Sequence, residues 1–166
     1  RSPSRGLGDV YKRQAPLWQV RLATHRLSGA VVAVKTIDKA RLNDPKLRTR
    51  AREEVRLHAR LSHAHVVTLY HVVDEPSRLH LVLEYAQRGS LRDALDGERR
   101  FSEERALKLV AQLLGALYYV HEVEAVAHRD IKLDNVLLAA NGDVKVRRVL
   151  QQLSLIHISE PTRRTP

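Results

Sequence analysis

The spacing of apolar and polar residues predicts strands in the first half of the chain. Apolar and polar residues alternate over 20–23, and a β-branched apolar run covers 31–35, so each segment is expected to form a strand. Two further strands are predicted at 66–73 and 79–83, because the Asp-Glu-Pro-Ser sequence between them is typical of a turn. These segments are expected to form a small, mainly antiparallel sheet.

Helical spacing occurs in three places. Asn43-Asp44-Pro45 is a helix start signal, and the apolar residues after it recur every three or four positions over residues 46–61. A short helix is expected to begin at Leu91. A long helix is expected after Ser102, a residue type that caps helix N-termini, and its apolar stripe consists of Leu107, Val110, Leu114, Leu117 and Val120.

The segments 136–138 and 143–146 flank the dipeptide Asn141-Gly142, which favours a β-hairpin. A type I′ turn is predicted, because Asn and Gly tolerate the positive φ that both central residues of such a turn require. The second half of the chain is therefore expected to combine helices with one small hairpin.

Composition permits a globular domain and excludes several kinds of site. The chain has 166 residues, of which 43% are hydrophobic, and this is enough to bury a core. It has no cysteine, which excludes disulfides and thiolate metal sites. The sequence shows no signal peptide, and no apolar run approaches the roughly 18 residues of a membrane span. A cytoplasmic, intracellular protein without a membrane span is expected.

The net charge of +10 raises the question of a nucleic-acid partner, since clustered basic residues are the electrostatic footprint of such proteins. The first 14 residues contribute +3 and the last 14 contribute +1, which leaves +6 for the interior. Only 4% of the residues are aromatic, so few side chains could stack on bases. A nucleic-acid partner is therefore disfavoured, and the charge is interpreted as solvated surface.

The strongest motif is His128-Arg-Asp-Ile-Lys-Leu-Asp-Asn135, which has the form H-R-D-x-K-x-x-N. It resembles the catalytic loop of the protein kinases, and the lysine is typical of the serine/threonine kinases. The resemblance implies that Asp130 accepts the proton of the substrate hydroxyl, Lys132 lies near the γ-phosphate of ATP, and Asn135 binds Mg²⁺. The His-Arg pair before Asp130 would hold the loop's shape. The alternative is a charged surface turn before a buried strand.

The strand predicted at 31–35 resembles a second kinase motif, V-A-[IV]-K. Period two puts Ala33 and Lys35 on one face of the strand. The resemblance implies that Ala33 leaves room for adenine and that Lys35 reaches the α- and β-phosphates. Glu54 lies on the apolar face of the predicted helix, where a carboxylate needs a partner, and Lys35 is the candidate. Alternatively, Glu54 pairs at the surface with a neighbouring arginine of the helix.

The resemblance also implies the other contacts with ATP. Backbone groups of Glu84 and Ala86 would hydrogen-bond adenine at a hinge between two lobes. Leu83 would be the gatekeeper residue before that hinge. Leu137 would form the floor of the adenine pocket.

The kinase glycine-rich loop, G-x-G-x-x-G-x-V, closes with a valine that corresponds to Val20. Its three glycines would correspond to Arg13, Ala15 and Trp18. The cradle of backbone N–H groups that covers the phosphates is therefore expected to be degraded or missing.

The resemblance covers residues 15 to about 147 and implies an α+β, protein-kinase-like fold. A small antiparallel-sheet N-lobe with one helix and a hinge would occupy 15–86, and the start of a helical C-lobe would occupy 87–147. The D-F-G motif, whose Asp binds Mg²⁺, would fall on Arg148-Val-Leu150 and is absent, as is a later A-P-E. The flanks 1–14 and 148–166 are expected to be non-native or disordered, because both resemble translated sequencing-adapter read-through.

Three classes of function follow. The first is a serine/threonine protein kinase that uses ATP and Mg²⁺ to phosphorylate protein hydroxyls, with this chain a truncated and inactive fragment of it. The second is a pseudokinase that binds nucleotide or acts as a scaffold. The third is a basic module for nucleic acid or protein, whose binding would depend steeply on salt. Within the kinases, the segments 21–25 and 35–43 resemble the branch of the AMP-activated and microtubule-affinity-regulating kinases.

Overall fold

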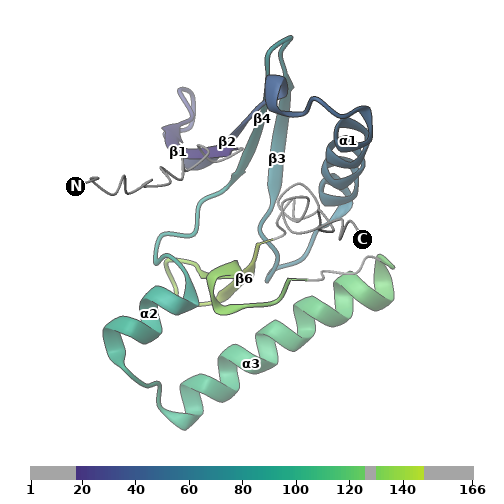
Figure 1. Cartoon of the computed structure of the whole chain (residues 1–166). Coiled ribbons are helices and arrows are strands. Elements are labelled where there is room, and N and C mark those ends of the chain that lie inside the picture. The colour runs from purple at the N-terminus through teal and green to yellow at the C-terminus, as the bar shows by residue number, and fades with distance from the viewer. Residues whose placement is uncertain (1–17, 126–129, 148–166) are drawn as a thin grey trace, which may run out of the picture.

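The computed structural model describes residues 18–125 and 130–147. Both predicted flanks, 1–14 and 148–166, lie outside these ranges, and so do His128 and Arg129 of the motif. Figure 1 shows two regions, with a sheet and a covering helix in the upper part and further helices with a small hairpin in the lower part.

The first region is built on a four-stranded antiparallel sheet with the strand order β1-β2-β4-β3. Its strands are β1 (Trp18–Thr24), β2 (Val31–Asp38), β3 (Leu69–Asp74) and β4 (Arg78–Glu84). The predicted sheet is confirmed.

The third strand begins at Leu69, so the prediction that it starts at residue 66 was wrong. Val66 is buried in the core of the second region, and Val67 donates its N–H to the carbonyl oxygen of Val146 at 3.0 Å. The apolar run is therefore shared between two regions, which its periodicity alone does not reveal.

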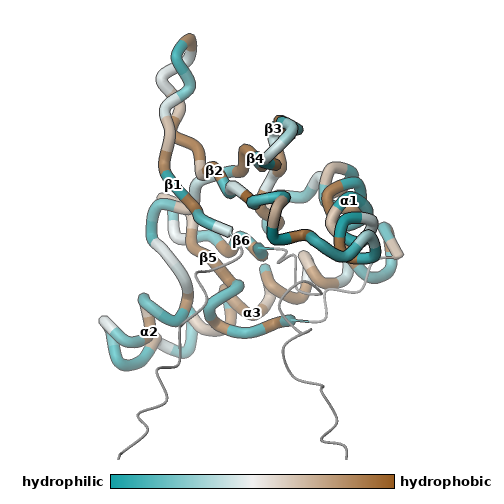
Figure 2. Tube along the Cα trace, turned by 45° about the horizontal axis from the view of Figure 1, so that its top comes forward, coloured by the Kyte–Doolittle hydropathy of each residue, from teal (hydrophilic) through white to brown (hydrophobic). Residues whose placement is uncertain are grey.

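Helix α1 (Pro45–Arg60) covers one side of the sheet, and it begins where the sequence predicts (Figure 1). Asp44 caps its N-terminus by accepting a hydrogen bond from the N–H of Lys46 at 2.8 Å. Ala51 and His58 are its buried residues. Figure 2 shows hydrophobic and hydrophilic residues alternating along this helix, as expected for an amphipathic element.

The first core lies between the sheet and α1. A single 3-10 turn, η1 (Lys39–Arg41), connects β2 to α1. Its buried residues come from β2, α1, β4 and the loops beside them, namely Ile37, Leu42, Ala51, Val67, Leu79, Leu81 and Leu83. Alternate residues of β2 and β4 face this core, which is the period-two pattern of a half-buried sheet.

The second region contains α2 (Leu91–Glu98), α3 (Glu103–Tyr118), the π-helical turn η2 (Tyr119–Val123), the 3-10 turn η3 (Leu133–Asn135), β5 (Val136–Leu138) and β6 (Val144–Val146). Helix α2 begins with a capping box, in which Ser90 accepts from the N–H of Asp93 and the Asp93 carboxylate accepts from the N–H of Ser90. Ser102 caps α3, as predicted, by accepting from the N–H of Arg105. Both helices therefore start at residues that satisfy their first N–H groups.

Most of the apolar stripe predicted on α3 lies on the open face of the helix, so the prediction named the wrong face. Leu107, Val110 and Leu114 are 64%, 50% and 60% exposed. Only Val120 of the stripe is buried, and it lies in η2, after the helix. The face of α3 that packs into the second core carries Leu109 and Ala116 instead.

The β5–β6 hairpin forms, but the predicted type I′ turn was wrong. Gly142 has a φ of +83°, whereas Asn141 is not among the described residues with positive φ. The carbonyl of Ala139 accepts the N–H of Gly142 at 2.9 Å, so Asn141 is the second central residue of a turn that ends in a left-handed glycine. Asn141 instead accepts the N–H of Asp143 through its side chain, which a negative φ allows.

Backbone and side-chain contacts join the two regions. The N–H of Val146 donates to the carbonyl oxygen of His65 at 2.8 Å, so the loop before β3 lies along β6. Lys145 Nζ lies 2.6 Å from the carboxylate of Glu84 at the end of β4. The predicted α+β class, with a sheet and one helix followed by helices and a hairpin, is confirmed. Across 18–125 and 130–147, no helix has the length and apolar character that crossing a membrane requires.

Candidate active site

Asp130, Lys132 and Asn135 come together immediately before β5. Asn135 is 1% exposed, and its Nδ2 donates to the carbonyl oxygen of Asp130 at 2.9 Å and to the Asp130 carboxylate at 2.5 Å. Lys132 Nζ lies 3.4 Å from the same carboxylate oxygen, Oδ2. An amide donor and an ammonium group therefore hold this carboxylate in place, as charge-assisted hydrogen bonds do.

The loop is fixed to the β5–β6 hairpin beneath it. The N–H of Asn135 donates to the carbonyl oxygen of Lys132 at 2.9 Å, which closes η3, and the N–H of Arg147 donates to the carbonyl oxygen of Asn135 at 2.8 Å. Val136 and Leu138 follow directly and are buried in the second core. Core packing therefore sets the position of the polar residues.

Lys35 lies on the core side of β2, paired in register with Val20 of β1, and is only 8% exposed. Its Nζ is 4.7 Å from the centroid of the Trp18 ring, which places the ammonium over an aromatic face. The pKa of Lys35 is lowered from 10.5 to about 8, first by burial and then by the positive charge of Arg147, while the carboxylate of Glu54 acts in the opposite direction.

Glu54 acts electrostatically on Lys35 from α1, so the two residues lie on the same side of the sheet. The ion pair between Lys35 and Glu54 stays a prediction.

The Lys35–Trp18 contact can be tested by fluorescence, because Trp18 is the only tryptophan of the chain and its emission therefore reports on this contact. We expect its fluorescence to titrate with a midpoint near pH 8 as Lys35 loses its proton. Between pH 8 and 10.5 the unfolded chain binds the proton that the folded chain has lost, so the free energy of unfolding should rise with pH by up to about 3 kcal/mol. Lys35→Met is the matched variant, and an unchanged titration in it would contradict the assignment.

The residues expected to surround adenine also converge. Ala33 of β2 and Leu137 of β5 both pack against the first core, so they approach it from the two regions. Leu83 pairs with Ala33 in register and is buried. Val20 of β1 is 47% exposed. Ala33, Leu83 and Leu137 therefore meet at the first core.

The backbone at the end of β4 has one group suited to a ligand. Ala86 is buried, and its carbonyl oxygen accepts the N–H of Gly89 at 3.3 Å. Within 18–125 and 130–147, the hydrogen bonds leave the Ala86 N–H without an acceptor. The N–H of Glu84 is used by the carbonyl oxygen of Thr68 at 2.9 Å. A hinge contact to a nucleotide is therefore open at the Ala86 N–H.

Comparison with known proteins identifies the family. Residues 18–147 match the protein kinase domain, and this covers most of the chain. The chain belongs to the protein kinase family.

Individual kinases are similar over the same part. Human NUAK family SNF1-like kinase 1 is 35% identical over 128 residues, which is 77% of this chain and 19% of that protein. An Aurora kinase of Schizosaccharomyces pombe is 38% identical over 128 residues, 77% of this chain and 36% of that protein. Maternal embryonic leucine zipper kinase of Xenopus laevis is 37% identical over 130 residues, 77% of this chain and 19% of that protein.

The chain spans about a fifth of the length of the first of these relatives. Serine/threonine kinases of the AMP-activated-kinase-related branch are among the relatives, as the sequence resemblance predicted, and the Aurora kinase is equally similar. Membership of the protein kinase family is therefore firm, and the relatives include kinases of the branch that the segments at 21–25 and 35–43 indicated.

The family generally uses Mg²⁺, whose preferred ligands are carboxylate and amide oxygens. Here the amide oxygen of Asn135, Oδ1, accepts a hydrogen bond from Arg147 Nη2 at 2.8 Å. The Asp130 carboxylate already holds Lys132 and the Asn135 amide. The part of the chain that the structure describes has no group of three or more His, Cys, Asp or Glu suited to a metal ion. This arrangement does not fit Mg²⁺ at Asn135.

Sequence reasoning missed two residues of the site. Trp18 was recognised only as a departure from a kinase glycine, yet it covers the Lys35 ammonium. Arg147 had no motif of its own, although counting along the kinase pattern places it directly before the D-F-G position. Burial lowers the pKa of the Arg147 guanidinium, while Asp134 and Asp130 oppose this. Arginine remains protonated in proteins, so this residue adds a fixed positive charge.

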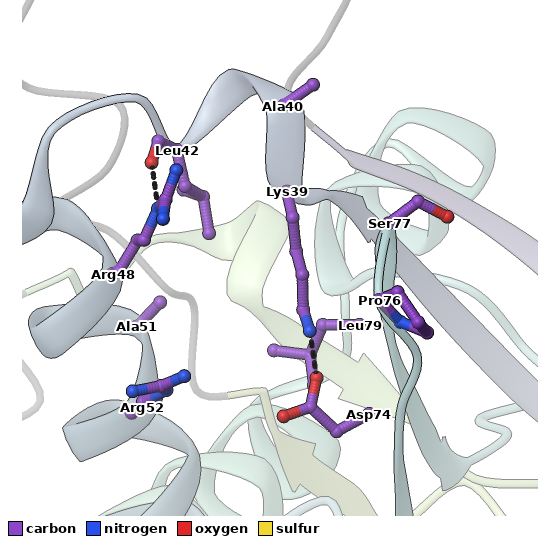
Figure 3. A pocket seen from close by; sticks show the side chains of 10 residues that line it. All are labelled: Lys39, Ala40, Leu42, Arg48, Ala51, Arg52, Asp74, Pro76, Ser77 and Leu79. Atoms are coloured by element: carbon purple, nitrogen blue, oxygen red, sulfur yellow. Dashed lines mark hydrogen bonds and ion pairs between the residues drawn. The ribbon is translucent and has the colours of Figure 1, made fainter.

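A separate pocket of about 440 Å³ lies at the other end of α1 (Figure 3). It is lined by η1, the start of α1 and the β3–β4 turn, and Figure 3 shows Lys39 extending toward Asp74 across it. On the side of the pocket formed by α1, Arg48 Nε donates to the carbonyl oxygen of Leu42 at 2.7 Å. None of the candidate site residues lines this pocket, so it is distinct from the catalytic loop.

Proposed function

We propose that the full-length protein is a serine/threonine protein kinase that transfers the γ-phosphoryl group of ATP to hydroxyl groups of proteins. The observation that supports this most directly is the Asp130 carboxylate, held by Asn135 at 2.5 Å and by Lys132 at 3.4 Å in the loop with the family's motif. A positioned carboxylate of this kind can accept the proton of an attacking hydroxyl.

The proposed step uses residues of this chain in named roles. The substrate oxygen forms a bond to the γ-phosphorus, the bond to the β–γ bridging oxygen breaks, and ADP leaves. Asp130 accepts the hydroxyl proton and Lys132 balances charge on the moving phosphoryl group. Lys35 would hold the α- and β-phosphates, with Glu54 favouring its protonated form.

The nucleotide's base would lie between the two regions. Ala33, Val20 and Leu137 would contact adenine, the Ala86 N–H would donate to it, and the carbonyl oxygen of Glu84 would accept from it. The Glu84 side chain has a different role, because it accepts from the N–H of Thr68 at 3.1 Å and pairs with Lys145. It ties the end of β4 to β6.

The proposal includes the division of the matched region and its place in the cell. We assign 15–86 to an N-lobe with its hinge and 87–147 to the start of a C-lobe, with 1–14 and 148–166 outside the kinase domain. The separate cores of the two regions support the division. A cytoplasmic location is proposed because ATP and the family's protein substrates are found there.

A direct assay tests the function. The full-length protein would be incubated with labelled ATP, Mg²⁺ and four basic peptides that differ only in having Ser, Thr, Tyr or Ala at the acceptor position. We expect label on the Ser and Thr peptides and none on the Ala peptide. Label on Tyr alone, or no transfer to any peptide by folded protein, would contradict the proposal.

A nucleotide-binding pseudokinase is the second candidate, and two contacts favour it. Trp18 covers Lys35, and Arg147 takes the oxygen of Asn135, so both of these kinase residues have a partner within the chain. ATP that raises the melting temperature of the full-length protein without any transfer to the Ser or Thr peptide would support this candidate.

A further inference from the structure

Arg147 is held against the catalytic loop by both its backbone and its side chain. Its N–H donates to the carbonyl oxygen of Asn135 at 2.8 Å, directly after β6 ends. Its Nη2 donates to Asn135 Oδ1 at 2.8 Å and lies 3.4 Å from the carbonyl oxygen of Asp134. The guanidinium is therefore fixed beside the loop and does not extend into solvent.

The amide of Asn135 links this cation to the catalytic carboxylate. Nδ2 donates to Asp130 Oδ2 at 2.5 Å, and Oδ1 accepts from Arg147 at 2.8 Å. Reversing the amide would set its NH₂ against a guanidinium and its oxygen against a carboxylate, so only one orientation satisfies both neighbours. The result is a continuous series of hydrogen bonds from Asp130 through Asn135 to Arg147.

This hydrogen-bonded series has the charge pattern of a metal site. A divalent cation would take the Asn135 oxygen on one side and be balanced by nearby carboxylates on the other. The guanidinium donates to that same oxygen, and the carboxylates of Asp134 and Asp130 both act on its positive charge. A guanidinium stays protonated across the physiological pH range, so it repels a second cation at this position.

We propose that the guanidinium of Arg147 takes the place of a divalent cation at Asn135 and Asp130, so that this chain binds no Mg²⁺ at its catalytic loop. This inference does not depend on phosphoryl transfer, because metal binding is measured without substrate. If Arg147 served only to fix the loop to β6, removing it would loosen the loop and create no metal site.

The test counts bound Mn²⁺, a stand-in with the same preference for oxygen ligands, by electron paramagnetic resonance of the free ion. The full 166-residue chain should show no saturable site at millimolar Mn²⁺. Arg147→Ala should gain one site per chain, and Arg147→Ala combined with Asp130→Asn should lose it again. Arg147→Met, which retains the aliphatic stem, replaces Arg147→Ala if circular dichroism shows that the latter is unfolded.

Arg26→Ala is the matched control, because it removes the same charge from the turn between β1 and β2 and should gain no site. Two results would overturn the proposal. One is a saturable Mn²⁺ site in the unaltered chain that Asp130→Asn abolishes. The other is a folded Arg147 variant that gains no site, which would leave Arg147 with a structural role alone.

Discussion

Asp130→Asn is expected to lower the transfer rate of the full-length kinase by about 10²- to 10⁴-fold, the range that a positioned general base contributes. The amide has the same shape as the carboxylate, and it can still accept a hydrogen bond from Asn135 through its oxygen. What it loses is the ability to accept the hydroxyl proton. The measurement is the initial rate of label transfer to the Ser peptide at saturating ATP.

The affinity for ATP separates this role from general damage. Asp130 acts on the hydroxyl of the substrate, so the dissociation constant for ATP should change little in the variant. Asp134→Asn is the matched control, because it makes the same chemical change at an exposed position of the same loop. A kinase that kept most of its activity with Asp130→Asn, or that lost as much with Asp134→Asn, would show that the catalytic assignment is wrong.

The polar residues of the site could be placed from the sequence because each belongs to a motif that also fixes its surroundings. In β2, alternation set Ala33 and Lys35 on one face, and the structure buries Lys35 there and packs Ala33 against the first core. Around Asn135, an apolar run predicted a buried strand, and that strand anchors the loop. Local periodicity was sufficient in both places because burial on one face is a local property of the strand.

The errors came from partners that are distant in sequence. The run before β3 reads as strand, but Val67 bonds with Val146, a residue that no local pattern connects to it. Asn141-Gly142 predicted a hairpin correctly, yet the side-chain bond of Asn141 to Asp143 allows a turn with one positive φ instead of two. Arg147 shows the same limit, since its meaning depends on the oxygen of Asn135, 12 residues earlier.

A polypeptide of exactly these 166 residues is expected to transfer no measurable phosphate. Catalysis of this kind relies on positioned charges, and loss of one such contact costs about 10²- to 10³-fold in rate. The sequence has Arg13, Ala15 and Trp18 at the glycine positions and no D-F-G, and Arg147 holds the Asn135 oxygen. Because these losses affect the same phosphates, their combined effect should exceed the range of the assay.

The assay measures label transfer from ATP to a generic basic protein in the presence of Mg²⁺, after a cooperative thermal transition has shown that the chain is folded. A folding check is needed because the open face of α3 exposes Leu107 and Leu114, which favours aggregation. The full-length protein is the positive control and Asp130→Ala in the 166-residue chain is the negative one. Transfer above background that disappears in Asp130→Ala would show that Asp130 works without the glycine loop and the D-F-G aspartate, and the expected inactivity would then be wrong.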